Sequence, residues 1–168
     1  MRARFGLANL CALVGVGLFA GCTAQASEGD TATAEPVQLA SADGEAIVVK
    51  VYKSPTCGCC ANWVEHLVAA GFEVDVEDTD QMPMVKADAG VPANLQSCHT
   101  AIIDDYVFEG HIPIETIQRF LEEAPDVDGL AVPGMPVGSP GMEMGDRVDP
   151  YDVIAFDGAR TSVYESHR

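Results

Sequence analysis

The chain has 168 residues, a formal net charge of −17 and 48% hydrophobic residues. A chain of this length forms one compact domain once a terminal signal is set aside, so a second core is not expected. The scarcity of Lys and Arg also argues against nucleic acid as a partner, because phosphate binding needs clustered basic side chains.

The N-terminal residues are typical of an export signal. Two arginines precede an apolar run over residues 5–20, which is too short for a membrane span. The run ends in LFAGC at Cys22, which is similar to the motif at which bacterial signal peptidases leave a lipid-bearing cysteine. We therefore predict a lipoprotein signal peptide over 1–21 and lipidation of Cys22; simple secretion after Ala26 is the alternative.

The residues after the signal predict a membrane anchor and a tether. Acyl groups on Cys22 would hold the chain at a membrane, and Thr23 in the next position is typical of an outer-membrane lipoprotein that faces the periplasm. Residues 22–45 are rich in small and polar residues and show no periodic apolar pattern. We expect a flexible tether over 22–45 and one folded domain over 46–168.

The first part of that domain predicts a βαβ unit. The β-branched run over 47–52 is typical of a buried strand. Apolar residues then recur at helical spacing from Trp63 to Val68, and Gly71 is expected to end this helix. Residues 72–77 alternate apolar and acidic side chains, as a half-buried strand does.

The next part predicts a short helix over 84–89, a loop and a β-hairpin. The hairpin strands are 101–103 and 106–108, on either side of a turn at two aspartates. Pro113 is expected at the first position of a further helix. The order β-α-β-(α)-β-β-α is the connectivity of a thioredoxin-like domain, so we predict an α/β fold with a central mixed sheet flanked by helices.

The C-terminal part predicts little helix. Residues 129–147 are dense in Gly, Pro and Met, which indicates an ordered loop rather than regular structure. Residues 151–156 and 161–164 predict a C-terminal β-hairpin.

The cysteines provide the clearest chemical signal. Cys11 lies in the predicted signal and Cys22 is the predicted lipidated residue. The remaining four are Cys57, Cys59, Cys60 and Cys98. Two disulfides are the usual arrangement in an exported protein. The spacing argues against it, because three cysteines lie within four residues and Cys57 with Cys60 is the one comfortable pair among them.

The cysteine loop is expected at the N-terminus of a helix, where the helix dipole favours thiolates. Thiolates select soft or borderline ions such as Cu(I), Zn(II) and iron–sulfur clusters. Structural zinc usually takes two separated cysteine pairs, whereas three sulfurs in one loop favour bridging. A polynuclear Cu(I) site therefore suits this spacing better than a single zinc ion.

These motifs resemble the CopG-like copper-resistance proteins, which are thioredoxin-fold domains marked by Cys-x-Cys-Cys and a later Cys-His. The resemblance extends from about Ile47 to Tyr164. Its motifs here are SPTCGCC at 54–60, SCHT at 97–100, EGHIP at 109–113 and the Gly, Pro and Met segment over 129–143. It implies a periplasmic protein that binds copper through Cys57, Cys59, Cys60 and Cys98.

The resemblance also draws attention to a departure from thioredoxins. Thioredoxins place a cis-proline before a Thr opposite the reactive cysteines, and here the matching tripeptide is Cys98-His99-Thr100. Two candidate ligands thus replace a peptide-binding element, which favours metal binding over disulfide exchange.

Several further side chains are weaker candidates. His99 is expected to bind metal or to donate a hydrogen bond to a thiolate. The thioethers of Met135, Met142 and Met144 are possible additional copper ligands, with gap filling as the alternative. His111 precedes the last predicted helix, where we interpret it as a polar cap or a surface residue.

The sequence is compatible with a copper-binding protein and with a redox enzyme. The leading hypothesis is a lipid-anchored periplasmic Cu(I)-binding protein whose partners are copper ions and another periplasmic copper protein. An alternative is a thiol-disulfide oxidoreductase with Cys57 as nucleophile and Cys60 as resolving thiol. A copper oxidoreductase at the same site is a third hypothesis.

Overall fold

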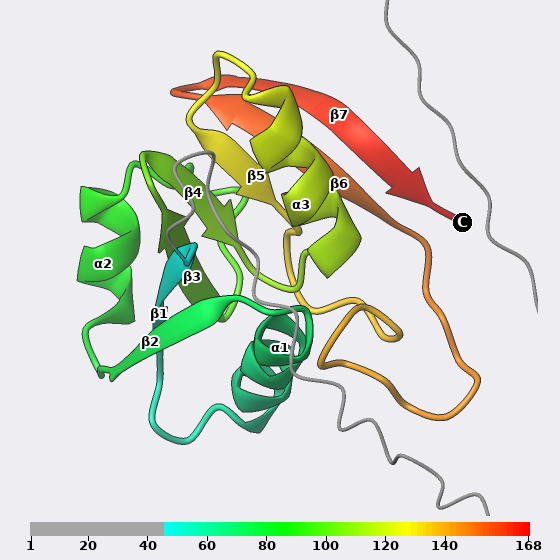
Figure 1. Cartoon of the computed structure of the whole chain (residues 1–168). Helices are drawn as coiled ribbons and strands as arrows, with labels where there is room; N and C mark the ends of the chain where they lie inside the picture. The colour runs from blue at the N-terminus through cyan, green and yellow to red at the C-terminus, as the bar shows by residue number, and fades with distance from the viewer. Residues whose placement is uncertain (1–45) are drawn as a thin grey trace, which may run out of the picture. The chain divides into compact units, whose positions relative to one another are not determined.

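The computed structural model describes residues 46–168 (Figure 1). The predicted signal peptide over 1–21, the lipidation site Cys22 and the tether over 22–45 lie outside the described residues. Over 46–168, no helix is long and apolar enough to cross a membrane.

One seven-stranded sheet organises the domain, with the strand order β2-β1-β3-β4-β5-β6-β7. The strands are β1 (Val48–Lys53), β2 (Glu73–Asp78), β3 (His99–Ile103), β4 (Tyr106–Glu109), β5 (Gly129–Ala131), β6 (Tyr151–Asp157) and β7 (Arg160–His167). The β1–β2 and β4–β5 pairs are parallel and the other four pairs are antiparallel. The predicted α/β class and mixed sheet are confirmed.

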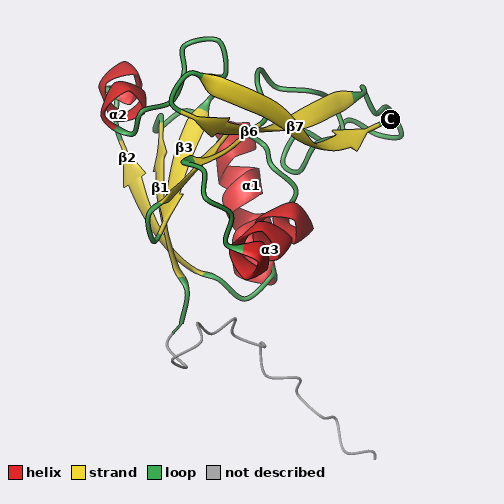
Figure 2. Ribbon diagram, turned by 90° about the horizontal axis from the view of Figure 1, so that it is seen from above, coloured by secondary structure: helices red, strands yellow, loops and turns green. Residues whose placement is uncertain are grey.

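Three helices cover the two faces of this sheet (Figure 2). They are α1 (Gly58–Ala69), α2 (Met82–Asp88) and α3 (Ile114–Glu123). Trp63 of α1 and Phe120 of α3 share one buried apolar cluster with Phe108 of β4, so these two helices pack on the same face. The α2 helix lies against the other face, over β1 and β3.

The predicted βαβ unit is present, but its second strand is more exposed than expected. Alternation over 72–77 predicts a half-buried strand, whereas most of β2 is exposed and Val76 keeps 39% of its surface. The β2 strand is the edge of the sheet and has a neighbour on one side only. Its acidic side chains therefore stay in water, and Lys50 of β1 pairs with Asp75 at 2.9 Å.

The C-terminal part confirms one prediction and corrects another. The β6 and β7 strands form the predicted hairpin, with Asp157 opposite Arg160 at its turn. The segment over 129–147 is not loop throughout, because Gly129–Ala131 form β5 between β4 and β6. A Cβ atom on Gly129 would lie 1.8 Å from the Val107 carbonyl oxygen, so only glycine allows this close pairing.

Candidate metal site

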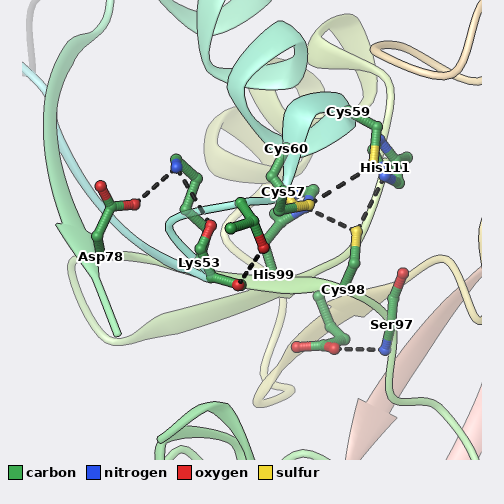
Figure 3. Close-up of a disulfide and its surroundings, with 12 residues drawn as sticks. Lys53, Cys57, Cys59, Cys60, Asp78, Ser97, Cys98, His99 and His111 are labelled. Carbon is green, nitrogen blue, oxygen red and sulfur yellow. Dashed lines mark hydrogen bonds and ion pairs between the residues drawn. A yellow bond between two sulfur atoms is a disulfide. The ribbon is translucent and has the colours of Figure 1, made fainter. Parts of the chain in front are cut away.

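The cysteine loop connects β1 to the first turn of α1. Cys57 precedes the helix and its backbone N–H donates to the Ser54 carbonyl oxygen at 3.0 Å, which turns the chain sharply after the strand. Cys57 and Cys60 form a disulfide, with their Cα atoms 5.4 Å apart (Figure 3). Cys59 is a free thiol whose Sγ lies 3.6 Å from Cys57 Sγ.

Cys98 reaches this loop from a distant part of the chain. The antiparallel pairing of β1 with β3 places Lys53 opposite His99, so the residue before β3 faces the loop after β1. One ligand atom from each of the four cysteines lies within 4.8 Å of the others. The structure therefore brings together the four sulfurs that the sequence singled out.

His99 lies beneath the sulfurs and is fully buried. Its ring packs on Trp63 at 4.4 Å between centroids, and its Nδ1 lies 3.3 Å from Cys98 Sγ. Burial, followed by the charges of His111 and Lys86, holds the pKa of His99 well below its usual value. The imidazole is therefore neutral, and in the described part of the chain its Nε2 has no hydrogen-bond partner.

His111 is buried at the site, so its interpretation as a cap or surface residue is wrong. Its Nε2 lies 3.1 Å from Cys98 Sγ (Figure 3). Its Nδ1 lies 2.8 Å from the Pro140 carbonyl oxygen. A carbonyl only accepts, so Nδ1 carries the ring proton and Nε2 presents its lone pair to the sulfur. Burial lowers the pKa of His111, which keeps this tautomer neutral.

The predicted hairpin contained a signal for His111. With the turn at Asp104 and Asp105, the observed register pairs Thr100 with Glu109. Extending the same register by two residues places Cys98 opposite His111. Counting residues outward from the predicted turn therefore pairs Cys98 with His111 in the sequence, but it does not show that His111 is buried.

The thiol of Cys98 is held in its protonated form. Burial is the main cause and the nearby Cys59 side chain is the second, and together they raise the pKa of Cys98 to about 12. The Cys98 S–H can then donate to His111 Nε2, and the N–H of His99 Nδ1 can donate to the sulfur. This assignment leaves the buried His99 Nε2 unprotonated and without a hydrogen-bond partner among the described residues.

A second group of candidate ligands therefore overlaps the first. Cys98, His99 and His111 offer one sulfur and two ring nitrogens within 4.8 Å of one another. Neutral imidazole and thiolate both suit copper and zinc. Cys98 belongs to both groups, so it joins the sulfur-rich loop to the two imidazoles.

The Gly, Pro and Met loop lies against this site. A Cβ atom on Gly141 would lie 2.6 Å from the Cys59 carbonyl oxygen and 2.8 Å from the Trp63 backbone nitrogen, so the loop touches the first two turns of α1. Figure 1 shows the segment between β5 and β6 running beside α1. Met135 and Met144 are 54% and 63% exposed, and Met142 is half-buried. Their role as ligands stays a prediction.

Comparisons with known proteins agree with the motifs. A family model described as "Protein of unknown function, DUF411" matches residues 95–142. A search of curated proteins finds no significant match. Two solved structures match almost over their full length, "Copper resistance protein copG- Form 2" and "Copper resistance protein copG- Form 1".

The similarity to these two structures is extensive. The first is 44% identical, with 73% of this chain and 98% of that chain covered and a TM-score of 0.69. The second is 45% identical, with 72% and 97% covered and the same TM-score. With identity at this level over nearly the whole of both relatives, the chain belongs to the CopG copper-resistance family.

Proposed function

We propose that this protein binds copper as Cu(I), in a polynuclear site, as part of copper resistance. The observation that carries the proposal is the convergence of four cysteine sulfurs, from two distant segments, within 4.8 Å of one another. The names of the two similar structures, which refer to copper resistance, support the choice of metal.

The donor set favours Cu(I) over other ions. Thiolates select soft ions, and three cysteines in one loop can each bridge two Cu(I) ions. His99 and His111 add two neutral ring nitrogens beside Cys98. We propose Cys57, Cys59, Cys60, Cys98 and His99 as the copper ligands, with His111 as an addition from the structure.

The disulfide sets a condition on copper binding. Cys57 and Cys60 cannot both act as thiolate ligands while they are bonded to each other. Reduction by a dithiol protein would take up two electrons and two protons, give two thiols here and leave the donor as a disulfide. Copper loading of all four sulfurs therefore requires a reduced site.

We further propose a thioredoxin-like domain in a periplasmic lipoprotein. The fold proposal is supported by the order β1–cysteine loop–α1–β2, followed by the antiparallel β3–β4 pair and α3. The location rests on the signal and lipidation motif at Cys22. Replacing Cys22 with Ser should move the protein from the outer-membrane fraction to the soluble periplasm.

Metal titration tests the copper proposal. The reduced protein, with Cys22→Ser for solubility, should bind more than one Cu(I) per chain under anaerobic conditions. Cys59→Ser and Cys98→Ser should each lower the stoichiometry, and Glu65→Gln at an exposed position of α1 is the control. Binding of no more than one ion, or unchanged stoichiometry in both cysteine variants, would contradict the proposal.

The Cys57–Cys60 disulfide favours a second candidate function, a thiol-disulfide oxidoreductase. Metal-free protein would then reduce insulin in the presence of a dithiol donor. Loss of this activity in Cys57→Ser, with retention in Cys98→Ser, would identify it. A copper oxidoreductase at the same site would instead show repeated change of copper oxidation state with turnover.

A further inference from the structure

A buried ion pair lies on the face of the sheet opposite the sulfur cluster. Lys86 of α2 donates from Nζ to Glu109 Oε1 of β4 at 2.5 Å and to Thr100 Oγ1 at 3.1 Å. The Thr100 hydroxyl in turn donates to Glu109 Oε2 at 2.6 Å. Lys86 is 4% exposed, and Glu109 and Thr100 are fully buried.

Such a pair needs an explanation other than stability. Removing two charges from water is expensive, and well-packed apolar residues often serve the fold as well or better. The EGHIP motif over 109–113 includes Glu109, but the proposed copper function uses only His111 from it. The other hydrogen bonds that the Glu109 carboxylate accepts therefore indicate its role.

Glu109 holds the residue that precedes Cys98. Its Oε1 accepts the backbone N–H of Ser97 at 2.5 Å. Figure 3 shows Ser97 beside Cys98. An apolar side chain at position 109 could pack there but could not accept this hydrogen bond. The charge on Lys86 and the hydroxyl of Thr100 orient the carboxylate that accepts it.

Ser97 is also restrained by two other contacts. Its hydroxyl donates to the Gly134 carbonyl oxygen in the loop after β5. A Cβ atom on Gly110 would lie 2.6 Å from both Cβ and Oγ of Ser97, so glycine makes room for this side chain. With Ser97 held in this way, Cys98 Sγ faces His111 and the cysteine loop.

We propose that Glu109, paired with Lys86, is a positioning residue for Cys98. It acts through the Ser97 N–H and sets where the Cys98 thiol lies relative to the other sulfurs and to His111. The expected effect on Cu(I) affinity rests on the proposed copper function. The positioning of Cys98 is a property of the metal-free protein and can be tested without copper.

Two double variants separate positioning from loss of charge. Lys86→Met with Glu109→Gln removes both charges and keeps an oxygen that can accept the Ser97 N–H. Lys86→Met with Glu109→Leu also removes both charges, at similar volume, and removes the acceptor. If either protein fails to fold, Glu109→Asp provides the same test, because its carboxylate keeps the charge but is shorter by one C–C bond, about 1.5 Å.

The first measurement is the rate of alkylation of Cys98 by iodoacetamide in metal-free protein with the disulfide intact. The Leu variant should react at least ~10-fold faster, because an unrestrained Ser97 lets the Cys98 segment open locally. The Gln variant should react at nearly the rate of the unaltered protein. Cys59, which lies on α1, is labelled in the same experiment and should keep its rate.

The second measurement is the affinity of the reduced proteins for Cu(I) in competition with a chelator. We expect binding at least ~10-fold weaker in the Leu variant than in the Gln variant, about 1.4 kcal/mol. Ile117→Val, on the buried side of α3, is the stability control, and it should change neither measurement.

Each outcome supports or overturns the proposal. Equal Cys98 rates in the Gln and Leu variants would overturn it, as would a parallel increase at Cys59, which indicates general loosening. If the unaltered protein binds no Cu(I), the proposed function fails, but the alkylation rates still decide whether Glu109 positions Cys98.

Discussion

The two faces of the sheet at β3 and β4 differ in the charge and the hydrogen bonding of their buried polar groups. Facing α1, the side chains of Cys98, His99 and His111 are uncharged in the metal-free protein, and His99 Nε2 has no hydrogen-bond partner among the described residues. Facing α2, Glu109 is charged and accepts hydrogen bonds from three groups. Within β3, His99 faces Trp63 of α1 and the next residue, Thr100, faces Lys86 of α2, because side chains alternate along a strand.

This difference indicates that the two faces have different roles, metal binding on one and positioning of a ligand on the other. A group that is to bind a metal must keep a lone pair available, and that leaves it poorly satisfied in the metal-free protein. A group that holds a ligand in place works best when all its bonds are made. We therefore expect substitutions on the α2 face to affect stability most, and those on the α1 face to affect copper most.

The largest expected effect is on the α2 face. Lys86→Met leaves the buried Glu109 carboxylate without its counter-ion and should lower the free energy of unfolding by about 3–5 kcal/mol. Urea denaturation measures this. Adding Glu109→Gln should restore most of the loss, and an equally unstable double variant would show that the charge of Glu109 is not the cause.

The next effect is expected where the loop meets the cysteine helix. Gly141 has φ of +82°, and a Cβ atom there would lie 2.6 Å from the Cys59 carbonyl oxygen. Gly141→Ala should lower stability by about 1–3 kcal/mol through backbone strain and should lift the loop from α1. Gly145→Ala, also at positive φ but with open space around its Cα, controls for the strain alone.

On the α1 face, His111→Gln tests the ligand that the sequence did not identify. We expect Cu(I) binding to weaken about 10-fold, or 1.4 kcal/mol, because Cys98 loses its neighbouring nitrogen donor. Chelator competition measures the affinity. Unchanged affinity would assign His111 a purely structural role, through its hydrogen bond to Pro140.

The same face should make the metal-free protein sensitive to acid. Burial lowers the pKa of His99 in the folded state. Below the ordinary value of about 6.5, His99 is therefore protonated in the unfolded chain and stays neutral in the folded chain. The contribution of His99 to the free energy of unfolding is therefore fully present above that pH and is lost as the pH falls below it. Between pH 7 and 5.5 we expect a loss of about 1 kcal/mol from His99, with His111 acting in the same direction. Urea denaturation at both pH values measures it, and constant stability would be inconsistent with neutral buried imidazoles.

The smallest effect is expected at the exposed methionines. Met135→Leu and Met144→Leu keep size and apolar character, and their side chains are 54% and 63% exposed. Cu(I) affinity should change by less than about twofold if they are surface residues. A larger loss, measured by the same competition, would instead support the prediction that these thioethers bind copper.

Local sequence patterns predicted the parts of the fold that depend on neighbours in the chain. The turn at Asp104 and Asp105 and the apolar runs beside it determine the β3–β4 hairpin. The strand, cysteine loop and helix from β1 to α1 follow from composition and spacing in the same way. Short elements without a strong pattern, such as β5, were missed because pairing with β4 and β6 forms them.

By itself, the sequence determined that three sulfurs crowd the start of a helix and that a fourth follows later beside a histidine. Only the tertiary structure decided that His111 is buried beside Cys98 and that Lys86 pairs with Glu109 on the opposite face of the sheet. The physical reason is that burial and charge pairing depend on which surfaces distant elements present to each other. Local periodicity predicts which face of a helix or strand is apolar. It does not identify which distant side chain will pair with a polar side chain.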